Sequence, residues 1–327
     1  MESQIFNSLI ENLTYEMKFP LSMIPNNMKD SIEEIRMRIN SPLCIYSKGK
    51  DYFVTKDGKL VSNPKEAVIV NFEQLNKTFQ IVSNYSIYAL TEELKNGFIT
   101  IKGGHRVGIG GKVIYNSFGI ESIKNISSLN FRIAREKRDI SNNIINHLIK
   151  DGEFLNTLII SPPQCGKTTL LRDIIRNLSN GMKDKDIKGF KIGLVDERSE
   201  IAGVFNGIPQ KDVGIRTDIL DSCFKSLGII ILIRSMSPEI IAVDEIGSLE
   251  DVLAIEDALR AGIKLIATVH GYSLEDIKSR KSLKDLFSEK VFKRYIILDN
   301  SFGVGTIKEI IDSDNLINLI RKEEVVC

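Results

Sequence analysis

The residues best suited to chemistry lie in Ser161-Pro-Pro-Gln-Cys-Gly-Lys-Thr168, between an apolar run and an amphipathic one. This segment matches the phosphate-loop pattern G-x-x-x-x-G-K-[ST] except at its first position, where serine replaces glycine. Gly166 lets the backbone curl so that its N–H groups face phosphate oxygens, and the following helix start adds partial positive charge. We therefore predict that consecutive residues bind a nucleoside triphosphate: Ser161, Pro162, Pro163, Gln164, Cys165, Gly166, Lys167, Thr168 and Thr169.

A second segment, Ile240-Ile-Ala-Val-Asp-Glu-Ile-Gly247, is an apolar run that ends in two acids. Lys167 is expected to reach the β- and γ-phosphates, while the Thr168 hydroxyl and the Asp244 carboxylate hold Mg²⁺. Glu245 is predicted to polarise the attacking water as a catalytic base. The two segments together indicate ATP and Mg²⁺ as cofactors and hydrolysis as the reaction. We expect Ser161 to narrow the tolerated loop geometry without removing binding, and whether it weakens hydrolysis is left open by the sequence.

A third cluster of charged residues, Asp196-Glu-Arg-Ser-Glu200, ends the expected strand 191–196. Ligands of open α/β sheets lie beyond the carboxyl ends of the strands, so these acids are expected to face the nucleotide. Glu197 and Glu200 would position water and Mg²⁺ or couple to a neighbouring subunit; a salt-bridged surface loop is the alternative. If strand 191–196 also lies between the two motif strands in the sheet, the domain belongs to the class with a catalytic glutamate after the second acid.

Two further residues complete the predicted site. His270, in Thr268-Val-His270-Gly after the strand 265–269, is placed to donate a hydrogen bond to the γ-phosphate. Arg234, just before the second acidic segment, is either a trans-acting arginine at the nucleotide or a structural one.

The elements that must position these residues alternate between β and α after residue 139, which predicts a mostly parallel sheet. The expected strands are 157–160, 191–196, 239–244 and 265–269, the expected helices are 169–178 and 249–260, and a hairpin is expected at 295–298 and 305–310. This half of the chain, 146–327, is predicted to be an α/β phosphate-loop NTPase domain.

Residues 1–145 show a different pattern, typical of a smaller α+β domain. The pattern predicts helices at 9–28, broken at Pro20, and at 72–88, and strands at 43–46, 52–55, 98–101 and 113–115. Residues 31–38 fit a helix or a strand. The glycine-dense segment 103–111 is expected to form a turn, because it lacks the spacing of a dinucleotide-binding fingerprint.

Composition limits the possible partners. The 327 residues include 44 basic and 43 acidic residues, so a net charge of +1 gives no global argument for nucleic acid or an anionic membrane. Cysteines at 44, 165, 223 and 327 have no metal-like spacing and are expected to be reduced thiols. The N-terminus does not resemble a secretory signal, and the longest apolar run, 229–233, is too short to span a bilayer. We expect a cytoplasmic protein that docks on membranes only peripherally.

Several stretches in order along the chain, from about residue 30 to 312, together resemble one family. They are residues 33–38, 86–93, 103–108, 195–203, 212–221, 234–247 and 254–271. They look like the type II/IV secretion ATPases, which are AAA+-like ring motors with a RecA/ASCE-like fold, and like their sporulation branch, the stage III sporulation protein AA family. Residues 196–200 resemble the "Asp box" of these ATPases and 268–270 their "His box".

The resemblance implies a homo-hexameric ATPase of the mother-cell cytoplasm that energises a channel of membrane-embedded sporulation proteins. It also implies that the smaller domain covers the nucleotide cleft, where Arg106, Arg132 and Arg135 are candidates for binding phosphate. The alternatives are a nucleic-acid-remodelling ATPase, which the balanced charge disfavours, and a non-hydrolysing scaffold, which the intact Lys167 and Glu245 disfavour.

Overall fold

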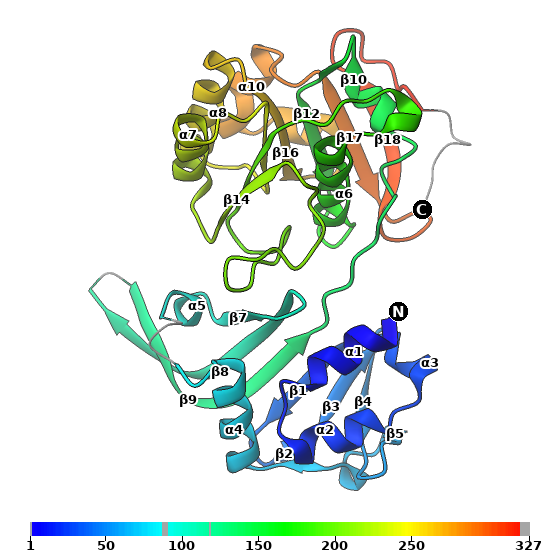
Figure 1. The fold of residues 1–327 in the computed structure, drawn as a ribbon, viewed down its shortest axis with the longest axis vertical. Coiled ribbons are helices and arrows are strands. Elements are labelled where there is room, and N and C mark those ends of the chain that lie inside the picture. The colour runs from blue at the N-terminus through cyan, green and yellow to red at the C-terminus, as the bar shows by residue number, and fades with distance from the viewer. Residues whose placement is uncertain (1, 87–90, 118, 321–327) are drawn as a thin grey trace. The chain divides into compact units, whose positions relative to one another are not determined.

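A computed structural model describes residues 2–86, 91–117 and 119–320, which divide into two compact units (Figure 1). Unit 1 contains Met1–Arg135 together with Gly203–Gln210, and unit 2 contains Glu136–Ala202 together with Lys211–Cys327. Each unit has its own core of buried aliphatic and aromatic side chains. Among the described residues, no helix is both long enough and apolar enough to cross a bilayer.

Unit 1 is built on an antiparallel sheet with the strand order β5-β4-β3-β1-β9-β8-β7. The pair β2 and β6 forms a small separate sheet. The strands are β1 Ile32–Arg38, β2 Ser41–Pro42, β3 Cys44–Ser47, β4 Lys50–Val54, β5 Leu60–Val61, β6 Ile69–Val70, β7 Phe98–Ile101, β8 His105–Asn116 and β9 Gly119–Arg132.

The helices of unit 1 are α1 Glu2–Ile10, α2 Tyr15–Ser22, α3 Asn26–Lys29, α4 Phe72–Val82 and α5 Thr91–Lys95, with a 3₁₀ turn η1 at Pro64–Glu66. The prediction of one helix over 9–28 broken at Pro20 was wrong, because Pro20 lies inside α2. The chain leaves the first helix earlier, where the Asn12 side chain donates to the Leu9 carbonyl at 3.0 Å.

Two other expectations for unit 1 are resolved. Residues 31–38, which fitted either element, form the strand β1. The helix expected at 72–88 ends at Val82, since Asn84 and Tyr85 adopt positive φ angles of 48° and 57°. The last residues of that prediction, 87 and 88, lie outside the described residues.

The glycine-dense segment is a turn only at its start. Gly103 and Gly104 have φ angles of 89° and 72°, and the strand β8 then begins at His105. The prediction that the later glycines form a turn was wrong, because they lie in β8 where it approaches β9 closely. A Cβ built on Gly110 would lie 2.2 Å from Ser128 Oγ, so glycine serves close strand packing beside the bulge.

Unit 2 is built on a sheet with the order β14-β13-β15-β16-β12-β17-β18. All neighbouring pairs are parallel except β17 and β18, which form the expected antiparallel hairpin. The strands, with the small pair β10–β11, are β10 Ile149–Lys150, β11 Glu153–Phe154, β12 Thr157–Ser161, β13 Ile192–Asp196, β14 Thr217–Asp221, β15 Ile240–Val243, β16 Lys264–His270, β17 Arg294–Asp299 and β18 Thr306–Asp312.

The helices of unit 2 connect these parallel strands. They are α6 Lys167–Asn180, α7 Lys225–Ser235, α8 Leu249–Arg260, α9 Leu274–Lys278 and α10 Lys284–Ser288, with 3₁₀ turns η3 Ile145–Leu148, η4 Lys183–Lys185 and η5 Lys281–Leu283. Every residue of β12, β13 and β15 is buried, as expected when helices cover both faces of a parallel sheet.

The strand order answers the question of which strand separates the two motif strands. The strand 192–196 does not lie between the two motif strands, because β13 pairs with β14 and β15. The strand that separates β15 from β12 is β16, which carries His270 at its end. The histidine therefore lies between the phosphate loop and the second acidic segment at the same edge of the sheet.

Candidate functional site

The predicted phosphate loop occupies the turn between β12 and α6. The positive φ angles of this turn belong to Gln164, at 61°, and Gly166, at 85°. Gly166 is the N-cap residue that precedes α6, and a Cβ built on it would lie 3.1 Å from Gly305 Cα. Both the backbone angle and the close approach favour glycine here, as in a loop whose amides face an anion.

The other loop residues are placed as follows. Ser161 is the buried last residue of β12, and its hydroxyl donates to the Pro162 carbonyl at 2.9 Å. Cys165 is buried, whereas Pro163 and Gln164 are exposed. Lys167, Thr168 and Thr169 form the first turn of α6.

Three side chains converge beyond this loop. Lys167 Nζ lies 3.5 Å from Glu245 Oε2 and 3.3 Å from His270 Nε2, and these last two atoms are 3.3 Å apart. His270 Nδ1 contacts the Ser161 carbonyl oxygen at 3.4 Å. The Ser161 carbonyl beside Nδ1 and the Glu245 carboxylate beside Nε2 are both acceptors, so either ring nitrogen has an oxygen to which its N–H can donate. Three predicted residues from three segments thus form one cluster.

Asp244 occupies the adjacent position on the acidic segment. Its Oδ1 accepts a hydrogen bond of 2.9 Å from the buried Thr268 hydroxyl, and Asp244 as a residue is only 7% exposed. Because Val243 pairs with Ala267 in the parallel register, the next residues of the two strands are brought side by side. Thr268 thereby sets the orientation of this acid.

The donor set at this edge fits a nucleotide with Mg²⁺. The loop presents backbone amides and Lys167 for phosphate, and the Thr168 hydroxyl and the Asp244 carboxylate are hard oxygen ligands. Within the described part of the chain, no group of three or more His, Cys, Asp or Glu side chains is arranged to hold a metal. Mg²⁺ is ordinarily held by one or two carboxylates plus substrate phosphates, so a sparse protein ligand set suits it.

A small cavity of about 180 Å³ joins the acids of this edge. Its lining residues are Glu197, Arg198, Lys225, Asp244, Glu245, Gly247, Ser248 and Asp251. Glu197 forms an ion pair with Lys225, the first residue of α7. Glu197 thus lies at the predicted site, but its carboxylate is already neutralised by a cation.

The aspartate of the third cluster does not face the nucleotide, which corrects the expectation for Asp196. Its fully buried carboxylate accepts the backbone N–H groups of Glu200, Ile201 and Ala202 at 2.8–3.0 Å. Burial raises the pKa of Asp196, and these three hydrogen bonds oppose that rise. Asp196 thus stabilises the loop that follows it, because the short side chain of an aspartate readily accepts hydrogen bonds from nearby backbone N–H groups.

Two basic side chains, Arg172 and Lys211, donate hydrogen bonds to backbone carbonyls of the same loop. Arg172 of α6, whose pKa burial lowers, donates to the carbonyls of Glu200 and Ile201. Lys211 donates to the Glu200 carbonyl at 3.2 Å. Burial and the neighbouring Arg172 lower the pKa of Lys211 to about 8, with Asp196, Glu200 and Glu136 opposing the shift. The backbone of Glu200 is thus fixed to the helix that follows the phosphate loop.

Arg234, the predicted arginine of unit 2, lies away from this cluster. Arg234 is exposed in the last turn of α7, just before β15 begins, and therefore at the opposite edge of the sheet from the loop. Its trans-acting role stays a prediction. In unit 1, Arg106 stacks on Phe98, Arg132 lies 3.9 Å from Glu34, and Arg135 donates to the Ile32 carbonyl at 2.7 Å.

Our sequence-based prediction missed the supporting residues Arg172, Lys211, Lys225 and Thr268. Of these four residues, only Thr268 could have been found from the sequence. It lies two residues before the candidate His270 on the same strand, and residues two apart on a strand share a face. The other three are cations scattered along the chain, and nothing in their spacing marks them.

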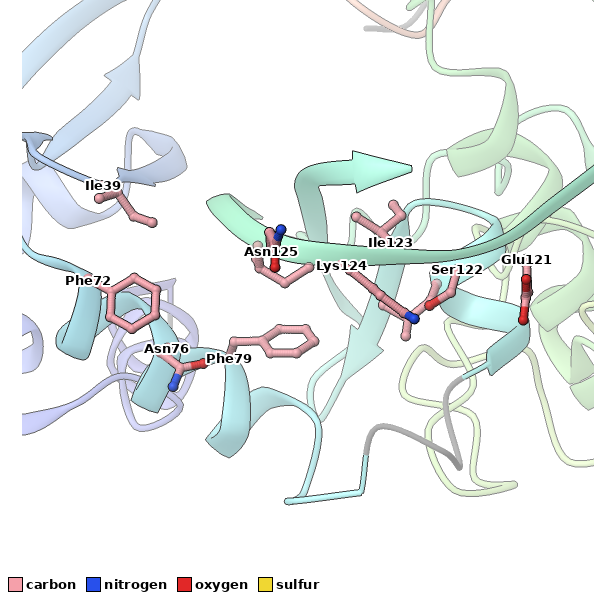
Figure 2. A pocket seen from close by; sticks show the side chains of 11 residues that line it. Ile39, Phe72, Asn76, Phe79, Glu121, Ser122, Ile123, Lys124 and Asn125 are labelled. Carbon is pink, nitrogen blue, oxygen red and sulfur yellow. The ribbon is translucent and has the colours of Figure 1, made fainter. Parts of the chain in front are cut away.

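A second depression lies in unit 1 and has a different character. This groove of about 800 Å³ is lined by Ile39, Phe72, Asn76, Phe79, Leu94, Glu121, Ser122, Ile123, Lys124, Asn125 and Ile126. Figure 2 shows Phe72, Asn76 and Phe79 on α4 and Ile123, Lys124 and Asn125 along β9. The lining is mainly apolar and contains none of the predicted site residues.

Comparison with known proteins agrees with this architecture. A sequence profile described as "Sporulation stage III, protein AA" matches residues 17–317. The chain is 44% identical over 308 residues to "Stage III sporulation protein AA" of Bacillus subtilis (strain 168), covering 94% of this chain and 95% of that protein.

Solved structures of two ATPases are similar in fold. The ATPase DotB of Legionella pneumophila is 15% identical with a TM-score of 0.52, over 81% of this chain and 72% of that one. DotB of Yersinia pseudotuberculosis is 14% identical with a TM-score of 0.51, over 81% and 70%. At this identity the likeness shows the fold, and the predicted α/β phosphate-loop fold with a mostly parallel sheet is confirmed.

Proposed function

The chain belongs to the sporulation stage III protein AA family, and we propose that it is an ATPase that converts ATP and water to ADP and phosphate. The observation that carries the proposal is the meeting of Lys167, Glu245 and His270 within 3.5 Å beyond the Gly166 turn. A cation, a carboxylate and an imidazole at a helix start are what phosphate binding and water activation require.

The binding roles follow from the positions. Backbone N–H groups of residues 164–168, at the start of α6, would surround the phosphates, and Lys167 would contact the β- and γ-phosphate oxygens. Thr168 and Asp244 would hold Mg²⁺, with Thr268 keeping the aspartate in place. Bound Mg²⁺ supplies charge neutralisation on the phosphate oxygens.

The catalytic roles fall to Glu245 and His270. Glu245 is one-third exposed beside the Lys167 ammonium and is suited to orient water and accept its proton. His270 lies between the loop strand and the acid strand, where its ring touches both Lys167 and Glu245. It is suited to sense the γ-phosphate. Glu197 and Glu200 would have supporting rather than direct catalytic roles. Glu197 forms an ion pair with Lys225, and the backbone carbonyl of Glu200 accepts a hydrogen bond from Arg172.

At a finer level, we propose a ring motor, most simply a homo-hexamer, in the mother-cell cytoplasm. It would act on a channel of membrane-embedded sporulation proteins and touch the membrane only at its periphery. Family membership and the fold shared with the DotB ATPases support this role. Unit 1 would cover the nucleotide. The near-zero net charge favours a protein partner over nucleic acid.

The test is phosphate release from ATP by wild type, Lys167→Ala and Glu245→Gln, with and without single-stranded DNA. We expect slow turnover by wild type that DNA leaves unchanged, and loss of turnover in both variants. Light scattering with a non-hydrolysable analogue measures assembly. Strong stimulation by DNA would contradict the channel role, wild-type turnover in Glu245→Gln would reassign the base, and a strict monomer would contradict the ring.

A further inference from the structure

The turn that joins β17 to β18 lies directly against the phosphate loop. A Cβ built on Gly166 would lie 3.2 Å from Gly305 N and 3.4 Å from Val304 Cγ1, so the turn packs on the N-cap residue of α6. Phe302 and Val304 in this turn are 72% and 58% exposed. Large apolar side chains so exposed beside a predicted ligand site need an explanation.

The arrangement of the sheet indicates which part of a nucleotide would meet this turn. The strand β12 has β16 on one side and β17 on the other. Lys167 contacts Glu245 and His270 on the β16 side, which is where the terminal phosphate must react. A nucleoside triphosphate carries its base at the opposite end of the phosphate chain. With the γ-phosphate on the β16 side, the nucleoside extends toward β17.

We infer that the β17–β18 turn is the platform for the nucleotide base, with Phe302 stacking on a purine ring and Val304 packing beside it. This inference rests on the proposed function, and it adds the residue that recognises the nucleoside. An aromatic ring beside a base contributes by stacking on its face, which every purine offers.

The hydroxyl groups of the turn are engaged within it. Ser301 Oγ donates to Asp299 Oδ1 at 2.8 Å, and Thr306 Oγ1 donates to the Gly303 carbonyl at 2.7 Å. They shape the turn and present its apolar side chains outward. The platform therefore holds a purine by its face and discriminates little between adenine and guanine.

The experiment compares binding of ADP, GDP and inorganic tripolyphosphate to wild type, Phe302→Ala, Phe302→Trp and Tyr272→Ala by calorimetry. Tyr272 is a matched control, since it is also 72% exposed but follows β16 on the other side of the loop. We expect Phe302→Ala to weaken ADP and GDP about tenfold or more while tripolyphosphate changes less than about twofold, because only the base is unsupported. Phe302→Trp and Tyr272→Ala should keep wild-type affinity.

Each other outcome overturns the inference. Unchanged ADP affinity in Phe302→Ala, with binding lost in Lys167→Ala, removes the platform and leaves the proposed function standing. If Phe302→Ala weakens the binding of tripolyphosphate as much as that of ADP, the turn supports the phosphate loop and does not bind the base. Weakening by Tyr272→Ala instead places the base on the β16 side. If wild type binds no ADP, both this inference and the proposed function fail. Thermal melting confirms that the variants are folded.

Discussion

Lys167 Nζ and Glu245 Oε2 lie 3.5 Å apart, and the lysine side chain is only 10% exposed. The proposed phosphate-binding cation and the proposed catalytic base are therefore partners of each other. A phosphate oxygen and the Glu245 carboxylate compete for the same ammonium group. Binding of a triphosphate would draw Lys167 to the phosphates and release Glu245 toward water, which links nucleotide binding to the readiness of the base.

Glu245→Gln should separate binding from hydrolysis. The amide keeps the size of the side chain but no longer attracts the ammonium, so nucleotide affinity should stay equal or rise a few-fold. Turnover should fall by about 10²-fold or more, the usual effect of losing a general base. Fluorescent nucleotide titration and phosphate release measure the two effects. Glu250→Gln, at an exposed position in the first turn of α8, is the control. Weaker binding with retained turnover would contradict the competition.

Thr268→Val should change the response to Mg²⁺. The hydroxyl holds Asp244 Oδ1 at 2.9 Å in a fully buried position, so its loss leaves the carboxylate oriented by fewer contacts. We expect a several-fold higher Mg²⁺ concentration for half-maximal turnover, with kcat at saturating Mg²⁺ less affected. Thr268→Ser retains the hydroxyl and should behave like wild type. A Mg²⁺ dependence unchanged in Thr268→Val would show that the hydrogen bond does not position the ligand.

Asp196→Ala should mainly affect stability. It leaves three backbone N–H groups without their acceptor in a buried loop, which predicts a loss of about 3 kcal/mol or more in the free energy of unfolding. Asp196→Asn keeps one acceptor oxygen and should lose less. Urea unfolding measures the effect, with Asp218→Ala on the exposed side of β14 as the control. Wild-type stability in Asp196→Ala would show that these three hydrogen bonds do not hold the loop.

Lys211 should give the stability of unit 2 a dependence on alkaline pH. Its pKa of about 8 in the folded protein lies below that of an unfolded lysine, about 10.4. Between these values the unfolded chain binds more protons, so this group makes stability rise as pH increases through that window. Lys211→Met should remove that contribution. Urea unfolding near pH 7.5 and 9.5 should show a smaller rise in the variant, whereas exposed Lys183→Met should follow wild type.

Most strands and helices of unit 2 were predicted from local sequence patterns. The features that were not predicted depend on long-range packing. The buried runs of β12 and β15 and the amphipathic α6 were predicted because each is specified by its own residues. The insertion of β16 between the two motif strands depends on crossover connections that no local pattern records. The inward turn of Asp196 had the same origin, since a carboxylate at a strand end can face a ligand or its own loop.

Ser161 raised the question of whether a missing first glycine weakens the loop, and the geometry allows an answer. The residue is the last of β12, and the positive φ angles of the loop belong to Gln164 and Gly166 instead. Ser161→Gly should therefore leave nucleotide affinity and turnover within about threefold of wild type, with a loss of roughly 0.5–1 kcal/mol in unfolding free energy.

Gly166→Ala is the informative counterpart of that substitution. The added Cβ would meet the Gly305 backbone at 3.1 Å, and the φ angle of 85° disfavours any side chain. Nucleotide affinity should fall at least tenfold in this variant, because the strain shifts the amides that face the phosphates. Titration of Ser161→Gly and Gly166→Ala with ADP measures whether nucleotide affinity depends on Gly166 and not on residue 161. A large gain in turnover for Ser161→Gly would mean that the serine hydroxyl, through its bond to Pro162, restrains the loop after all.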